Sequence, residues 1–338
     1  MYLIKAGMQN YHRSMRKIYI ITVLTAGLFI LNACKKDSEV FVPDAGQITG
    51  PDTNWYASIT PLMPVNDLQT SLLLSPDIDS IDVSNAADTI HSASGLQCIF
   101  PAAGCVDSTG AAVNGKIYVQ SFLLKNRGHF IAMGLPTASQ GNPLVSGGAF
   151  SIQLQKGNSI LQLAKDSFIN ISYADTAISQ EMKLFNVYMP WSNMPFDWVQ
   201  DTAKTNTIEP GNYSYNIKSN QLQWINCSRY YGDTTANNKT TLAVKLPPNL
   251  TNANTLAYVV VNNVRSVISM SGIAASKEFV ATKIPAGLNV TIVTISKDGN
   301  FYYLGQQTTT TVMPAANPIA IVPARVTLDD IKNYLNTL

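Results

Sequence analysis

Short segments in which apolar and polar residues alternate set the strongest limit on how this chain can fold. GGAFSIQLQ (147–155) alternates three apolar residues with polar neighbours, and residues 115–124 and 167–173 are similarly rich in β-branched and aromatic side chains. A period of two places one set of side chains on a single face of a strand. Turn-forming residues such as Lys156-Gly157-Asn158 separate these segments. Short strands at this spacing predict a β-sandwich.

A second group of strand-like segments begins near residue 241. Its clearest members are TLAVKLP (241–247), LAYVVVNN (256–263), RSVISM (265–270), FVATKIP (279–285) and VTIVTIS (290–296). Asp298-Gly299 follows the last of these and predicts a hairpin, because these residues tolerate the positive φ that tight hairpin turns require. We therefore expect two Ig-like or regulatory-like β-sandwich domains, at 59–240 and 241–322.

The last residues, 323–338, contain a helical pattern. Thr327 is a good N-cap residue, and two acidic residues follow in the first turn. The apolar residues of this segment fall on one helical face; they are Leu328, Ile331, Leu335 and Leu338. The predicted fold class is therefore all-β, with two β-sandwich domains and a short C-terminal helix that packs onto a sheet.

The first 33 residues have the composition of a secretory leader. Arg16 and Lys17 precede an apolar run, residues 18–31, and small residues follow it. A transmembrane helix needs about 20 apolar residues, and this run is shorter. We interpret residues 1–33 as a signal peptide, with Met15 as an alternative start.

Leu31-Asn32-Ala33-Cys34 resembles a lipobox, the site at which bacterial lipoproteins are cut before a lipidated cysteine. This predicts lipidation of Cys34, with residues 34–58 as a flexible tether. Acyl chains on the cysteine would hold the protein on the outer membrane, in either the periplasmic or the cell-surface orientation. The alternative is an ordinary signal peptide followed by an unrelated cysteine.

The charge balance bears on the partners of the mature chain. Cleavage removes Lys5, Arg13, Arg16 and Lys17, which takes the formal net charge from +2 to −2. Nucleic acid is therefore not an expected partner, because phosphate binding requires concentrated positive charge. The expected partners are the membrane, through the lipid anchor, and a polysaccharide or another envelope protein.

Three cysteines remain after Cys34. Cys98 and Cys105 flank a Pro-Ala-Ala-Gly bend that would allow a disulfide in an oxidising compartment. The alternative is that Cys98, Cys105 and Cys227 are all small buried apolar residues. Both interpretations stay open at this point.

Aromatic residues are concentrated in FNVYMPWSNMPFDWV, residues 185–199. Tyr188, Trp191, Phe196 and Trp198 are candidates for stacking against sugar rings. The alternative is that these side chains fill a core or the junction between domains, because aromatic burial is strongly stabilising.

No catalytic or metal-binding pattern stands out. His91 and His129 lie in no recognised ligand spacing. The acidic run from Asp77 to Asp82 lacks the glycine and the closing glutamate of an EF-hand, so we interpret it as a solvated strand or loop. We expect no catalytic residue, no metal site and no cofactor.

Three segments resemble, in order, parts of a recurring family of uncharacterised Bacteroidetes lipoproteins. They are GLQCIFPAAGCVDSTGAAVNGKIYVQ (95–120), LPTASQGNPLVSGGAFSIQL (135–154) and LQWINCSRYYGD (222–233). Ser228 stands where that family carries an aspartate. The first half also resembles the β-sandwiches of carboxypeptidase-regulatory-like and ZU5-type domains. The resemblance implies a β-sandwich fold and attachment to the envelope, and it implies no reaction.

Taken together, these patterns predict a lipid-anchored envelope protein of non-catalytic, structural or accessory type. Two alternatives remain: a surface glycan-binding protein that uses the aromatics of 185–199, and a hydrolase whose site is not recognised.

Overall fold

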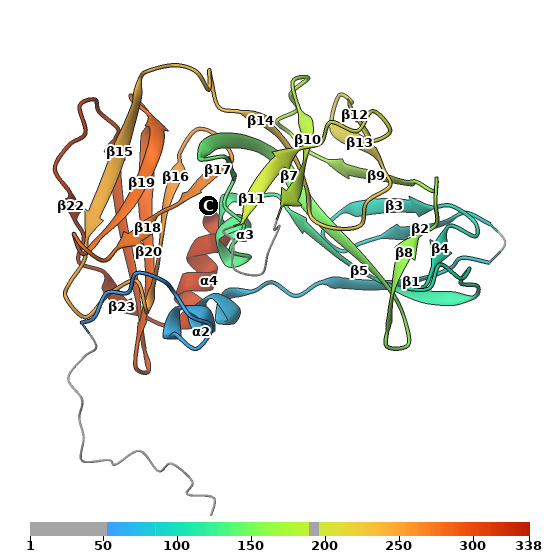
Figure 1. Ribbon diagram of the computed structural model, residues 1–338, viewed down its shortest axis with the longest axis horizontal. Coiled ribbons are helices and arrows are strands. Elements are labelled where there is room, and N and C mark those ends of the chain that lie inside the picture. The colour runs from blue at the N-terminus through green and yellow to red at the C-terminus, as the bar shows by residue number, and fades with distance from the viewer. Residues whose placement is uncertain (1–52, 85, 189–195) are drawn as a thin grey trace, which may run out of the picture. The chain divides into compact units, whose positions relative to one another are not determined.

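The computed structural model describes residues 53–84, 86–188 and 196–338. Within these residues the chain forms four β-sheets and three helices, α2, α3 and α4 (Figure 1). The prediction of an all-β sandwich fold with a short C-terminal helix is confirmed. The leader and the candidate lipidation site, Cys34, lie outside the described residues.

The first sandwich contains two antiparallel sheets. The larger follows the order β1 (Asp77–Asp82), β5 (Lys116–Leu124), β7 (Asn142–Lys156), β14 (Ile225–Tyr230), β10 (Lys183–Tyr188) and β11 (Asp197–Gln200), with β4 (Cys105–Val106), β6 (Ala138–Ser139) and β8 (Ser159–Leu163) paired beside this path. The smaller follows the order β12 (Thr207–Pro210), β13 (Ser214–Ser219), β9 (Ile169–Ala174), β3 (Leu96–Phe100) and β2 (Asp88–His91).

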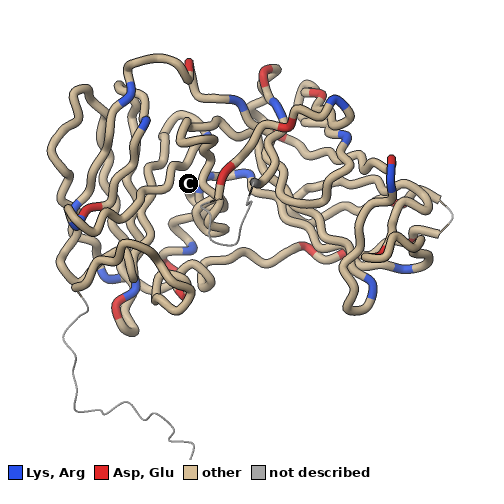
Figure 2. Tube along the Cα trace, viewed as in Figure 1, with Lys and Arg blue, Asp and Glu red and all other residues tan. Residues whose placement is uncertain are grey.

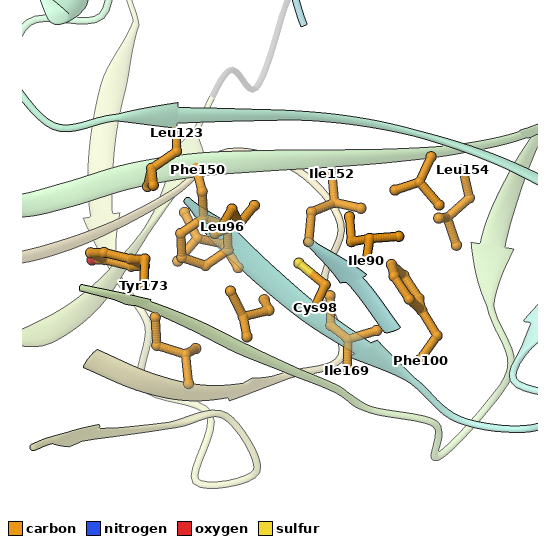
Figure 3. Packing of buried hydrophobic residues seen from close by; sticks show 14 of the residues in the cluster. Ile90, Leu96, Cys98, Phe100, Leu123, Phe150, Ile152, Leu154, Ile169 and Tyr173 are labelled. Carbon is orange, nitrogen blue, oxygen red and sulfur yellow. The ribbon is translucent and has the colours of Figure 1, made fainter. Parts of the chain in front are cut away.

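Alternation along the strands creates the core between these two sheets. On β3, Leu96, Cys98 and Phe100 are buried, whereas the residues between them are more exposed. Figure 3 shows these side chains meeting Phe150 and Ile152, which come from β7 on the opposite sheet. The period of two in the sequence therefore marks the faces that pack together.

The second sandwich also has two sheets. One follows the order β18 (Ser271–Ile273), β19 (Glu278–Pro285), β15 (Lys239–Lys245) and β22 (Ile319–Ala320); the other follows β17 (Ser266–Ser269), β16 (Thr255–Val261), β20 (Asn289–Asp298), β21 (Phe301–Thr310) and β23 (Ala324–Val326). The hairpin expected at Asp298-Gly299 joins β20 to β21, where Asp298 pairs with Phe301. Gly299 supplies the positive φ of the turn, at 56°.

A third apolar cluster lies on the other face of β16 and β20. Tyr258 and Val260 of β16 and Val293 and Ile295 of β20 are buried there. The cluster also contains residues from β5, β7, β10, β11 and all three helices, so it joins the two sandwiches: Leu68, Leu72, Leu124, Phe130, Ile131, Leu144, Ala149, Phe185, Trp198, Ile331 and Leu335. We call it the seam cluster. The two sandwiches accordingly belong to one compact unit.

Helix α2 (Pro64–Leu72) has no counterpart in the sequence-based expectations. It contacts β16 and β20, although residues 59–240 were expected to form the first sandwich. Part of the expected tether, 34–58, is also docked. The ring of Trp55 lies 5.1 Å from that of Phe279, and the Tyr56 backbone exchanges two hydrogen bonds with the Asn252 side chain.

Helix α4 (Leu328–Thr337) begins as predicted at Thr327. The Thr327 hydroxyl accepts from the Asp330 backbone N–H at 3.1 Å, and the Asp330 carboxylate accepts from the Thr327 backbone N–H. Ile331 and Leu335 are buried in the seam cluster, where α4 packs against α3 (Arg127–Ala132). Within the described ranges, no helix combines the length and the apolar character needed to cross a bilayer.

Candidate functional site

A groove of about 520 Å³ lies where the first sandwich meets the β16–β17 turn of the second. We call it the seam groove. Its lining residues are Lys125, Asn126, Arg127, Val145, Ser146, Ala177, Ile178, Ser179, Met182, Arg229, Asn262, Asn263, Val264, Arg265 and Leu338. Its volume is in the range of small-ligand sites, which often form at the junctions of domains.

The seam groove gathers three of the four arginines that follow residue 33. These three are Arg127, Arg229 and Arg265. The fourth, Arg325, lies over the ring of Phe301, at 3.5 Å. Lys125 adds another cation, and none of the described lining residues is Asp or Glu. Figure 2 shows that the remaining charged residues, of both signs, are scattered along the trace.

Arg265 holds the two sandwiches together at the groove. Its Nη1 donates to Asp175 Oδ2 at 2.8 Å and its Nη2 donates to Asp175 Oδ1 at 3.3 Å. Nη1 also donates to the carbonyl of Ser146, whose own N–H donates to the Arg265 carbonyl. Burial acts to raise the Asp175 pKa, but hydrogen bonds from Arg265 and the Ala177 backbone outweigh it, so the pKa lies below its ordinary value. The positive charge of Arg265 is therefore cancelled within the protein.

Arg127 is hydrogen-bonded to three backbone oxygens. Its Nη1 donates to the carbonyls of Val261 and Asn262, at 3.0 and 2.8 Å, and its Nε donates to the Leu338 backbone oxygen at 2.7 Å. Burial lowers the pKa of Arg127, and the nearby charge of Arg265 also lowers it, whereas the interaction with Tyr334 raises it.

Arg229 and Lys125 complete the positive wall. Arg229 lies on β14, and its Nε is buried and makes no hydrogen bond within the described residues. The Glu181 carboxylate is 3.7 Å from that nitrogen, but its side chain is 78% exposed, so solvent screens the pair. Lys125 directly follows β5. Guanidinium and ammonium groups donate hydrogen bonds and do not act as bases here, so this wall is suited to holding an oxyanion.

Two of the segments that resemble the lipoprotein family pair with each other beside the groove. Asn226 on β14 accepts hydrogen bonds from the hydroxyls of Ser146 and Ser228, both at 2.7 Å. The pairing of β14 with β7 shifts between Cys227 and Ser228, opposite Gly147. A Cβ on Gly147 would lie 2.8 Å from the Tyr215 ring. An ionised aspartate at 228 could not donate this hydrogen bond to Asn226 Oδ1.

The three described cysteines are free and buried. Cys98 lies on β3, which pairs with β2 and β9, whereas Cys105 lies on β4, which pairs with β8. The bend between them therefore carries the chain from one sheet to the other, and the expected alternative of a Cys98–Cys105 disulfide is not formed. Burial raises the pKa of Cys98 and Cys227 to about 12 and that of Cys105 to about 11, so these thiols stay protonated.

Of the aromatic candidates for sugar stacking, Trp198 is instead a core residue. It is fully buried in the seam cluster, and its Nε1 donates to the Pro136 carbonyl at 2.9 Å. Phe196 is half-buried and packs edge-on against the Trp198 ring, with 5.0 Å between centroids. Tyr188 pairs with Asp197 through its backbone, and Trp191 lies outside the described residues. Trp198 therefore cannot offer a face to a sugar, because packing covers its ring.

The structure also shows where the acidic run from Asp77 to Asp82 and the two histidines lie. Asp77 and Asp82 lie on opposite faces of β1, and each accepts a backbone hydrogen bond, from Ser94 and Ser84 respectively. In the part of the chain that the structure describes, no three His, Cys, Asp or Glu side chains gather as metal ligands. His91 is exposed on β2. His129 lies on α3, and burial lowers its pKa, which keeps it neutral.

Comparison with family models, with curated proteins and with solved structures gives no match for this chain.

Sequence reasoning missed the seam groove. Its arginines are separated by about 100 and about 40 residues, and no spacing rule connects them. Arg265 gave a local sign, because it is a charged residue at the start of the strand-like segment 265–270, next to the turn that follows 256–263. Arginine is scarce in the chain, and this scarcity was a second sign that each arginine has a specific place in the fold.

Proposed function

We propose that this chain is a lipid-anchored protein of the cell envelope that acts by binding, as a non-catalytic accessory or structural module. The observation that carries the binding role is the seam groove, which is lined by three of the four arginines after residue 33. Fixed guanidinium donors suit recognition of a ligand or partner rather than proton transfer.

The leader and the lipobox-like residues before Cys34 support the anchored location. The pairing of Ser146 and Gly148 with the strand that carries Ile225, Asn226 and Cys227 supports membership of the Bacteroidetes-type lipoprotein family, because both segments then belong to one sheet. Attachment to the outer membrane, with the body on either face of it, follows from that membership.

Metabolic labelling with radioactive palmitate tests the anchor. We expect the wild type to incorporate the label and Cys34→Ser to lose it, with the Ser38→Ala variant, four residues further on, labelled like the wild type. Equal labelling of wild type and Cys34→Ser would contradict the lipid-anchored location.

A further inference from the structure

The second half of β21 is an open edge of its sheet. Residues 302–304 of this strand pair with β23, whereas residues 305–310 pair only with β20 within the described part of the chain. The pairing with β20 continues through these residues without a register shift. The backbone of 305–310 therefore forms a regular strand that has a strand neighbour on one side. We call it the open edge.

The backbone groups on the free side of the open edge belong to alternate residues. The Thr311 N–H donates to the Leu288 carbonyl, next to the start of β20, at 2.9 Å. Backbone groups along an antiparallel strand alternate in direction, so the N–H and C=O groups of Gln306, Thr308 and Thr310 point away from β20. These groups bond to no other backbone group among the described residues.

The strands at the ends of the sheets are shorter or capped. Four residues or fewer form each of β2, β11, β12, β17, β18, β22 and β23. β1 has six, but carboxylates occupy its backbone: the Ser80 N–H donates to Asp79 and the Asp82 N–H donates to Asp88, at 2.7 and 3.0 Å. Neither device is present at the open edge.

The open edge also lacks the residues that usually prevent strand pairing. Sheet edges are commonly protected by charged residues, prolines or bulges. Its sequence, GQQTTT, has none of these, and both glutamines and two of the three threonines are exposed. No Asp, Glu, Lys, Arg or His occurs in residues 299–324. The chemistry that fits this edge is therefore an extended backbone, and a copy of the same edge would bring no like charges together.

Exposed apolar residues lie at both ends of the open edge. Val312 and Met313 are exposed just beyond its last residue. Val322, which is 84% exposed, lies near its first residue, because the side chain of the adjacent Pro323 is 3.1 Å from a Cβ built on Gly305. In a two-fold antiparallel pair, the end of each edge lies beside the beginning of the other. Val312 and Met313 of one copy would then approach Val322 of the second.

We infer that β21 pairs with β21 of a second copy of this chain, antiparallel about a two-fold axis near Thr308, so that one sheet continues through both copies. Gln306 of each copy opposes Thr310 of the other, and their outward N–H and C=O groups bond to each other. The paired edge is short, so the dimer is weak and depends on protein concentration. This contact involves neither the seam groove nor Cys34, and it is independent of the proposed function.

Disulfide cross-linking of the purified full-length protein tests this pairing. Thr308→Cys places two thiols on facing residues whose Cα atoms are about 5.5 Å apart, a distance that a disulfide spans. With copper phenanthroline as the oxidant, we expect a dimer on non-reducing gels that reductant removes.

Two controls measure cross-linking away from the open edge. The wild type has three described cysteines, all buried, and Ile160→Cys introduces a thiol on β8 at a position that is 62% exposed. Both should give little dimer. A Thr308→Cys protein that cross-links no more than Ile160→Cys would overturn the inference.

A proline tests whether backbone hydrogen bonds hold the two copies together. Thr310→Pro in the Thr308→Cys protein removes an outward N–H and no hydrogen bond to β20, so it should lower the cross-linked fraction by about fivefold. Thr310→Ala keeps the N–H and should cross-link like its parent. Thermal unfolding confirms that both variants are folded. Equal cross-linking of the folded proline and alanine variants would rule out strand pairing.

A synthetic peptide of residues 304–312 distinguishes a second copy from another partner. An excess of the peptide should compete for the open edge and lower the cross-linking of two Thr308→Cys proteins. If the protein instead cross-links to a peptide with the same Thr308→Cys change but not to itself, the edge accepts a strand of another protein, and the choice of a second copy is wrong.

Discussion

An ion pair between two individual side chains helps the seam cluster to join the two sandwiches. Asp175 comes from the end of β9, and Arg265 comes from the turn before β17. The Asp175 side chain is 2% exposed and that of Arg265 is 19% exposed, so solvent screens this ion pair little. A buried pair of this kind is costly to break from one side, because the remaining charge loses its partner.

Arg265→Ala should therefore lower the free energy of unfolding by about 3 kcal/mol. The control is Lys245→Ala, which removes a pair with Glu278 in which the lysine side chain is 57% exposed. That change should lower the free energy of unfolding by less than about 1 kcal/mol. Chemical denaturation of both variants measures the difference. Equal costs would mean that the Arg265–Asp175 pair does not hold the seam.

Asp175 also makes stability depend on pH. Its folded pKa lies below the ordinary value of 3.8, so its contribution is present above that value and is lost as the pH falls through the folded pKa. Between pH 5 and pH 2, the wild type should lose more stability than Asp175→Asn, which has no proton to gain. Parallel pH profiles for the two proteins would contradict this role of Asp175.

Variants of Trp198 distinguish a structural role of this side chain from a sugar-binding role. Trp198→Ala should lower the free energy of unfolding by about 3–5 kcal/mol, because it leaves a large cavity in the seam cluster. Trp198→Phe should cost less, since it keeps an aromatic ring and loses the hydrogen bond to Pro136. Retention on a polysaccharide gel should not depend on the Trp198 ring in any variant that stays folded. Loss of retention with unchanged stability would restore Trp198 as a ligand contact.

At the scale of elements, close contact between α3 and α4 fixes the short C-terminal helix. A Cβ built on Gly128 of α3 would lie 1.7 Å from the Leu335 backbone oxygen of α4. The backbone φ of Gly128 is not in the positive range, so only space requires glycine there. A backbone atom cannot move aside as a flexible side chain can, so the two helices would have to separate.

Gly128→Ala should therefore destabilise the protein by about 3 kcal/mol, at the upper end of the range for overpacking. Gly110→Ala is a useful comparison. Gly110 has a φ of 84° with no atom near its Cβ position, so its cost should be only that of backbone strain, about 1 kcal/mol. Thermal unfolding of both variants provides the test. A Gly128→Ala protein as stable as the wild type would show that α3 and α4 do not pack so closely.

The strands could be predicted from the sequence, whereas the surfaces that cover a strand buried on both faces could not. β3 and the second half of β7 alternate between buried and more exposed residues, and α4 has a capping box, so their positions follow from local rules. LAYVVVNN (256–263) predicts a strand, but its unbroken apolar run means that β16 is covered on both faces, by the second core and by the seam cluster. Helix α2 was missed because its three buried positions are Val65, Leu68 and Leu72, a sparse pattern that begins at a proline.

The candidate site was harder to predict than the fold, because its residues come from different elements. Lys125, Arg127, Arg229 and Arg265 come together only through the pairing of strands that are far apart in the sequence. The lipobox-like residues before Cys34 could be found, because that pattern is local. A pattern within one element can be recognised in the sequence, whereas a contact between distant elements can be predicted only when the topology is known.

At the scale of the whole molecule, the seam cluster should make the two sandwiches unfold together. Ile171 is buried in the first core and Ile292 in the second. Ile171→Ala and Ile292→Ala should each lower the free energy of unfolding by about 2–5 kcal/mol. Both should lower the midpoint of one shared transition in calorimetry, because neither sandwich keeps a covered surface without the other. Two separate transitions, each sensitive to one variant, would show that the sandwiches fold independently.

The docking of Trp55 and helix α2 onto the second sandwich affects how this protein can be divided. A fragment that stops at residue 240 would contain Leu68 and Leu72 but not β16 and β20, the strands that they cover. During synthesis Leu68 and Leu72 stay uncovered while more than half of the remaining chain is made, because β16 and β20 are translated only then. Truncation at the apparent boundary is therefore expected to produce an aggregating piece, and expression should keep residues 53–338 together.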